Sequence, residues 1–64
     1  MSLTAESLRD MLRVGRVAVR IGMPSGECWA LLVAVHRDRA ITVSVTGILV
    51  RVPLRDVREA TPSR

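Results

Sequence analysis

A two-residue alternation runs through ITVSVTGILVRV, the stretch from Ile41 to Val52. β-Branched residues occupy every second position, which is typical of strands with one buried face. A two-residue hairpin loop at Thr46-Gly47 would pair these residues across two strands. The pairs are Val45 with Ile48, Val43 with Val50 and Ile41 with Val52. The pattern therefore predicts an antiparallel hairpin whose buried face carries these three pairs.

The sequence before this hairpin predicts two further strands. In Val17–Ile21, Val and Ile alternate with Ala and Arg, and the turn-forming residues of 22–26 follow. The segment Glu27–His36 is apolar on both faces. A three-residue loop at Arg37–Arg39 sets its register against Ile41–Val45, and that register predicts that the larger side chains point inward. These are Trp29, Leu31, Val33 and Val35.

This register leaves a stripe of Ala30, Leu32 and Ala34 on the outer face. One interpretation is that an amino-terminal helix covers the stripe. Thr4 is a typical N-cap for a helix over residues 4–13, with Leu8, Met11 and Leu12 on one apolar face. The other interpretation is that the stripe is an oligomer interface, because an apolar patch of this kind is rarely left exposed on a monomer.

The 64 residues are expected to form a single domain, 1–64. Pro53 ends the fourth strand, Leu54–Asp56 suits one helical turn, and Val57 begins a fifth strand. The predicted organisation is a helix at 4–13, a β-structure at 14–60 and a loose tail at 61–64.

This order of elements resembles the small SH3-like barrels, which include Sm-like, Tudor-like and KOW-type modules. The residues that carry the resemblance are Val17–Ile21, Gly26–Trp29, Val33–Val35, Ile41–Val45 and Gly47–Arg58. The leading helix makes the Sm/Hfq branch the nearest comparison, and the end of the chain, 61–64, also looks like the end of the Hfq core. The resemblance implies a mainly β fold, a five-stranded, strongly bent antiparallel barrel, with self-association into rings and RNA binding. Where Hfq has an aromatic-Lys-His step, this chain has Arg51-Val52-Pro53, so the family's RNA-pocket residues are not carried over.

The composition argues against catalysis. One Cys and one His make neither a disulfide nor a zinc site. Cys28 and His36 lie eight residues apart on one expected strand, hence about 26 Å apart at ~3.3 Å per residue. The carboxylates occur in separate segments, and no glycine-rich phosphate motif is present. We therefore expect a protein that is not an enzyme and that uses no metal or cofactor, with His36 as a strand-end residue.

The arginines point to a function in binding. All ten basic residues are Arg, and the net charge is +4, which favours contact with phosphates. The predicted nucleic-acid-binding residues are Arg16, Arg20, Arg37, Arg39 and Arg51. The chain has no Asn or Gln, so weak base specificity is expected for either RNA or DNA. The only aromatic residue, Trp29, is interpreted either as a core residue or as a partly exposed platform for a ligand or base.

Two alternatives to nucleic-acid binding stay open. The arginines are equally compatible with a solvated surface that keeps a small apolar protein in solution. The chain would then be a protein–protein assembly module, of a mobile-element or phage type, that uses the Ala30–Leu32–Ala34 stripe or a sheet edge. In either case the longest apolar stretch, Cys28–Val35, is far shorter than the roughly 20 residues of a membrane-spanning helix. With an unpaired cysteine, this favours a cytoplasmic protein. A chain this small, without a disulfide or a metal, buries only a marginal core, so we also expect a homo-oligomer.

Overall fold

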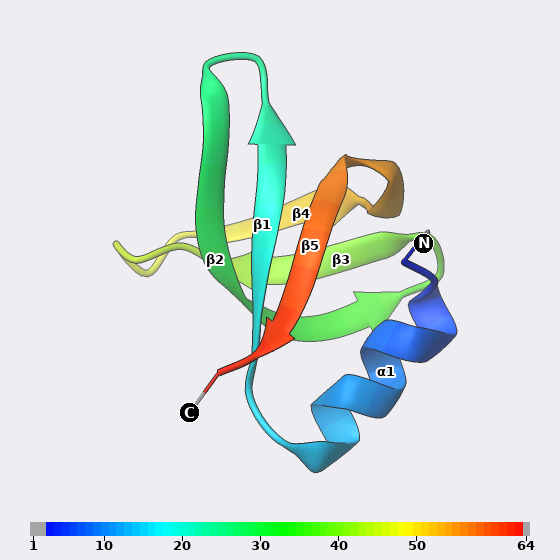
Figure 1. Ribbon diagram of the computed structural model, residues 1–64. Helices are drawn as coiled ribbons and strands as arrows, with labels where there is room; N and C mark the ends of the chain where they lie inside the picture. The colour runs from blue at the N-terminus through cyan, green and yellow to red at the C-terminus, as the bar shows by residue number, and fades with distance from the viewer. Residues whose placement is uncertain (1–2, 64) are drawn as a thin grey trace.

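The computed structural model describes residues 3–63 and consists of one helix and a five-stranded antiparallel sheet (Figure 1). The elements, in chain order, are α1 (Ala5–Val14), β1 (Val17–Met23), β2 (Gly26–His36), β3 (Arg39–Val43), β4 (Leu49–Pro53), the 3-10 turn η1 (Leu54–Asp56) and β5 (Val57–Pro62). The strand order in the sheet is β4-β3-β2-β1-β5. The sheet folds over so that β3 and β4 cross behind β1 and β5 (Figure 1). Within residues 3–63, β4 and β5 are the two edges of the sheet, which does not close by hydrogen bonding between them.

Helix α1 begins at the predicted N-cap. The Thr4 hydroxyl accepts the backbone N–H of Ser7 at 3.1 Å, and the Ser7 hydroxyl accepts that of Thr4 at 3.1 Å, so two orphan donors are satisfied reciprocally. The helix continues one residue beyond its predicted end, to Val14, before the Gly15 N–H bonds to the Met11 carbonyl at 3.3 Å. No helix among the described residues is long and apolar enough to cross a membrane.

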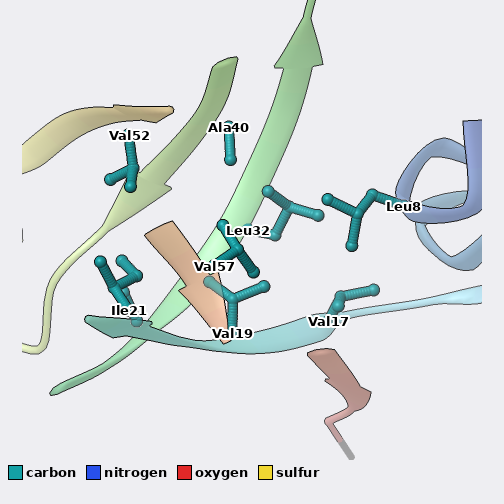
Figure 2. Packing of buried hydrophobic residues seen from close by; sticks show 9 residues of the cluster. Leu8, Val17, Val19, Ile21, Leu32, Ala40, Val52 and Val57 are labelled. Carbon is teal, nitrogen blue, oxygen red and sulfur yellow. The ribbon is translucent and has the colours of Figure 1, made fainter. Parts of the chain in front are cut away.

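The core lies between α1 and the inner face of the folded sheet (Figure 2). Its buried hydrophobic residues are Leu8, Val17, Val19, Ile21, Ala30, Leu32, Ala40, Val52 and Val57. The alternation in β1 is confirmed, because Val17, Val19 and Ile21 are all buried. From α1, the Leu8 side chain points toward Leu32 (Figure 2). The helix therefore covers one end of the core.

The predicted inward face of β2 is wrong for Trp29, Leu31 and Val33, which are exposed, and holds only for Val35, which packs against the core. Ala30 and Leu32 are buried, whereas Trp29 and Leu31 are 46% and 43% exposed. The cause is a bulge at Val33, where the register shifts between Leu32 and Ala34. A bulge adds one residue to a strand and so exchanges its two faces.

The Ala30–Leu32–Ala34 stripe is therefore not a continuous outer surface. Ala30 and Leu32 belong to the core, and the interpretation that places them under α1 fits the position of Leu8. Ala34, beyond the bulge, is half-buried and pairs with Ile41. Two of the three residues predicted as an oligomer interface thus have almost no surface to offer a partner.

The predicted register of the β3–β4 hairpin is wrong by one residue. Ala40 pairs with Val52 and Thr42 pairs with Val50. The connection is a five-residue loop, 44–48, instead of Thr46-Gly47 alone. It is closed by bonds of 2.9 Å from the Ser44 N–H to the Ile48 carbonyl and from the Gly47 N–H to the Ser44 carbonyl. These bonds stabilise the longer loop, and the longer loop turns Ala40 and Thr42 inward.

The turn between β2 and β3 is shorter than predicted. It contains Arg37 and Asp38 only, and Arg39 is already the first residue of β3. At the carboxyl end, η1 and the start of β5 at Val57 are confirmed. The predicted loose tail is wrong for residues 61–63. β5 runs to Pro62, and the Ser63 N–H donates to the Arg16 carbonyl at 2.8 Å; Arg64 lies outside the described residues.

Candidate anion-binding surface

Three basic side chains come together on the outer face of the sheet, beside the β2–β3 turn. His36 and Arg39 are direct partners across the β2–β3 ladder. Arg51 is the partner of Ile41 in the next ladder. Since Arg39 and Ile41 are two residues apart on β3, their side chains lie on the same face. We call His36, Arg39 and Arg51, together with Arg37 of the adjoining turn, the basic cluster.

A shallow hollow of about 270 Å³ lies between the side chains of the basic cluster. Its lining consists of His36, Arg39, Ile41 and Arg51. The Ile41 side chain is the apolar part of this lining, and the imidazole and guanidinium groups of the other three residues supply hydrogen-bond donors. Guanidinium groups bind phosphate or carboxylate oxygens through paired N–H bonds. The chemistry of the hollow therefore suits an oxyanion.

The backbone beside the cluster holds Arg37 in an unusual conformation. Arg37 has φ +60°, in the left-handed region that most side chains disfavour. The turn is fastened to η1, because the Leu54 N–H donates to the Asp38 carbonyl at 3.0 Å. Strained residues of this kind concentrate at functional sites, where the surrounding structure holds them.

No ion pair within residues 3–63 involves an arginine of the basic cluster. The ion pairs there join Arg13 to Asp10 and Arg20 to Glu27 and Glu59. Arg37, Arg39 and Arg51 take part in none of them and are exposed. Their positive charge is therefore directed to the solvent and to any anion that approaches.

The five arginines predicted as one binding set occupy three places. Arg37, Arg39 and Arg51 belong to the basic cluster. Arg16 lies between α1 and β1, in a separate hollow that Val14, Gly15 and Ser63 also line.

Arg20 is occupied by contacts within the chain. Its guanidinium lies 3.3 Å from a Glu27 carboxylate oxygen and 3.1 Å from one of Glu59. With two carboxylates already beside it, Arg20 ties β1 to its neighbours β2 and β5 and adds no free positive charge.

His36 is the member of the basic cluster that the sequence reasoning did not assign to binding. The signal is its spacing of three residues from Arg39 across a tight turn, which makes the two direct partners. The predicted loop, Arg37–Arg39, includes Arg39 and so separates it from the strand residue His36.

Trp29 lies on the outer face of β2, so the interpretation of it as a core residue is wrong. The alternative, a partly exposed side chain, is confirmed, and its contact with a ligand stays a prediction. Cys28 and His36 lie near opposite ends of β2, as predicted. The Cys28 thiol donates to the Met23 sulfur at 3.4 Å. No group of three or more His, Cys, Asp or Glu suited to a metal ion occurs among residues 3–63.

No protein-family model, curated protein or solved structure matches this chain. Its function is therefore inferred from its own side chains.

Proposed function

We propose that this protein is a non-catalytic RNA- or DNA-binding protein that holds the phosphate backbone with the basic cluster. One observation carries the proposal: Arg39 and Arg51 converge with His36 on one hollow and have no carboxylate partner within residues 3–63. A nucleic acid presents phosphates at regular short intervals, so several cationic side chains gathered on one surface bind it better than scattered ones.

Binding in this proposal is electrostatic, so the protein discriminates little between base sequences. Arginines that contact phosphates release counterions, and this release makes the affinity fall steeply as the salt concentration rises. Base-edge readout relies largely on Asn and Gln besides Arg, and the chain contains neither. The basic cluster is therefore expected to distinguish single strands from duplexes by shape more than by sequence.

The proposal includes the fold type and the setting. The strand order β4-β3-β2-β1-β5, the folded sheet and the leading helix support an SH3-like, Sm-like barrel that is open between β4 and β5. We assign the protein to the cytoplasm and expect it to act as a homo-oligomer. Two exposed sheet edges in a 64-residue chain support self-association, because unpaired edge strands readily add a further strand.

Fluorescence anisotropy with labelled single-stranded RNA and with duplex DNA tests the function. Titrations between about 50 and 200 mM salt should give submicromolar binding at the low end and a linear fall of log K with log salt. Replacing Arg39 and Arg51 together with Ala should weaken binding about tenfold at low salt and reduce the salt slope by about 2.

A matched control removes the same charge elsewhere. Arg9 and Arg58 are exposed and lie outside the basic cluster, so the Arg9→Ala/Arg58→Ala protein should keep most of the affinity. If the two double variants lose affinity equally, net charge and not the cluster governs binding. If the unaltered protein binds neither probe at low salt, the arginines are a solvated surface and the proposal fails.

A second candidate function is a protein–protein assembly module. The observation that favours it is the large apolar area of the outer face, where Trp29, Leu31, Val33 and Leu49 are exposed. Apolar patches of this kind mark interaction sites on small proteins. Absence of nucleic-acid binding at low salt, with the fold intact, would make this candidate the better one.

A further inference from the structure

An apolar patch occupies the middle of the outer face, next to the basic cluster but distinct from it. We define it by Ala18, Trp29, Leu31, Val43, Val45 and Leu49. Three ladders place these residues side by side. Ala18 pairs with Leu31, Leu31 pairs with Val43, and Val43 pairs with Leu49. The patch thus crosses four neighbouring strands and contains no charged side chain.

The shape of the apolar patch combines a projection with a hollow. Val45 lies in the β3–β4 loop and is 94% exposed. In Figure 1 this loop projects beyond β2. Val45 also forms part of the wall of a hollow of about 180 Å³, together with Trp29, Leu31 and Val43. A branched aliphatic side chain is small enough to enter this hollow. A surface that carries a projecting side chain next to a hollow offers both halves of a contact across a two-fold axis.

The exposed area of the chain also points to a second copy. The chain exposes 4789 Å², whereas a folded monomer of 7.0 kDa is expected to expose about 4,040 Å². The excess of about 750 Å² is close to the roughly 800 Å² that each partner buries in a stable interface. A dimer contact of that size would bring the exposed area per chain to that of an ordinary small protein.

We infer that two copies of this chain associate face to face through the apolar patch, with Val45 of each copy entering the hollow beside Trp29 of the other. This inference deepens the self-association part of the proposed function, and it names a face of the sheet instead of the β4 and β5 edges. On β2 and β3, His36 and Arg39 lie past the Val33 bulge, at the opposite end from the apolar patch, whereas Arg51 lies two residues from Leu49 on the same face of β4. We expect His36, Arg37 and Arg39 to stay exposed in the dimer, which then presents two phosphate-binding surfaces.

Sedimentation equilibrium over a range of concentrations tests the interface. The unaltered chain should approach twice its 7.0 kDa mass. Leu31→Glu, which places a charge at the centre of the patch, should remain at the mass of one chain. Val14→Glu is the matched control, because Val14 is 91% exposed and lies outside the patch, and it should dimerise like the unaltered protein.

Trp29 gives a second readout that needs no substitution. It is the only aromatic residue of the chain and belongs to the apolar patch. On dilution its emission should shift to the red and its quenching by acrylamide should increase, in step with the loss of dimer. This result decides the matter even if Leu31→Glu does not fold, which circular dichroism would reveal.

The outcomes separate this inference from nucleic-acid binding. A mass of one chain at every concentration overturns the dimer. A dimer that survives Leu31→Glu in folded form, or one whose dissociation leaves Trp29 fluorescence unchanged, shows that the contact lies on another face. In each of these cases the RNA and DNA titrations still test the basic cluster, because they do not depend on the dimer. A monomeric Leu31→Glu protein that retains binding confirms both.

Discussion

The hydroxyl of Thr42 donates a hydrogen bond of 3.1 Å to the carbonyl of Val50, its direct partner across the β3–β4 ladder. Thr42 is 1% exposed and is the buried polar residue among the apolar side chains of the core. The bond satisfies a hydroxyl that would otherwise be desolvated without a partner, and it fixes β3 against β4 in the observed register.

Thr42→Val should therefore lower the free energy of unfolding by about 1 kcal/mol, because it keeps the side-chain volume and removes only the hydrogen bond. Urea denaturation followed by circular dichroism measures this change. A Thr42→Val protein that is as stable as the original, or more stable, would show that the added apolar burial outweighs the bond.

Two glycines provide a matched test of backbone conformation. Neither Gly47 nor Gly15 has another atom within 4 Å of the position that a Cβ would occupy. Gly47 has φ +86°, in the left-handed region, whereas Gly15 has φ 169°, which is extended backbone. Gly47→Ala should therefore destabilise the protein by about 1 kcal/mol. Gly15→Ala should stabilise it by about 0.5 kcal/mol through the unfolded chain. Thermal melts of both variants check the opposite signs, and a stabilising Gly47→Ala would mean that the 44–48 loop adopts another conformation.

Arg37 should show opposite effects on stability and on binding. Because its φ is +60°, Arg37→Gly relieves a backbone conformation that is unfavourable by about 1 kcal/mol, and the melting temperature should rise. The same substitution removes one charge of the basic cluster, so the affinity for RNA or DNA should fall and its salt slope should flatten by about 1.

Arg37→Ala is the control for that experiment. It removes the same charge while keeping a Cβ in the left-handed region, so it should weaken binding equally without raising the melting temperature. Equal melting temperatures for the Gly and Ala variants would contradict the strain at position 37.

Local signals in the sequence predicted those parts of the fold that depend on near neighbours. Thr4 caps α1, Val17–Ile21 alternates as expected, and Leu54–Asp56 forms the short turn before β5. Each is set by contacts or conformational preferences within a few residues. The failures occur where a single residue changes the phase of a strand, at the Val33 bulge and in the 44–48 loop. Glu27–His36 is apolar on both faces, so its sequence gives no sign of a bulge. The prediction therefore continued the period-two alternation through Val33.

The sequence predicted the residue type of the candidate site, arginine, but not how its residues are arranged, because the predicted β3–β4 register was wrong by one residue. In the predicted register Arg51 pairs with Thr42, on the face opposite to Ile41. In the observed register Arg51 pairs with Ile41, and this places it beside Arg39. A register shift of one residue thus decides whether Arg39 and Arg51 lie on opposite faces of the sheet or side by side on the same face. The composition indicated arginines as candidates, but only the observed ladder shows which of them lie together.

Leu8 is the most deeply buried of the α1 residues that pack against the core, beside Met11 and Leu12, and its replacement is the most severe change we predict. A helix of ten residues is marginal in isolation, and Leu8 is its one fully buried side chain. Leu8→Ala should remove about 2–5 kcal/mol from a domain that has about 3–10 kcal/mol in total at 0.05–0.15 kcal/mol per residue. We expect a large shift of the urea midpoint, with part of the protein unfolded before denaturant is added.

Val14→Ala is the control for Leu8, because Val14 belongs to the same helix and is almost fully exposed. It should change stability by less than about 0.5 kcal/mol. If Leu8→Ala unfolds at the same urea concentration as Val14→Ala, the sheet is stable without the helix, and α1 does not close the end of the core. If only Leu8→Ala is destabilised, the helix and the sheet unfold as one unit. The basic cluster at the β2–β3 turn then depends on a residue more than 25 positions earlier in the chain.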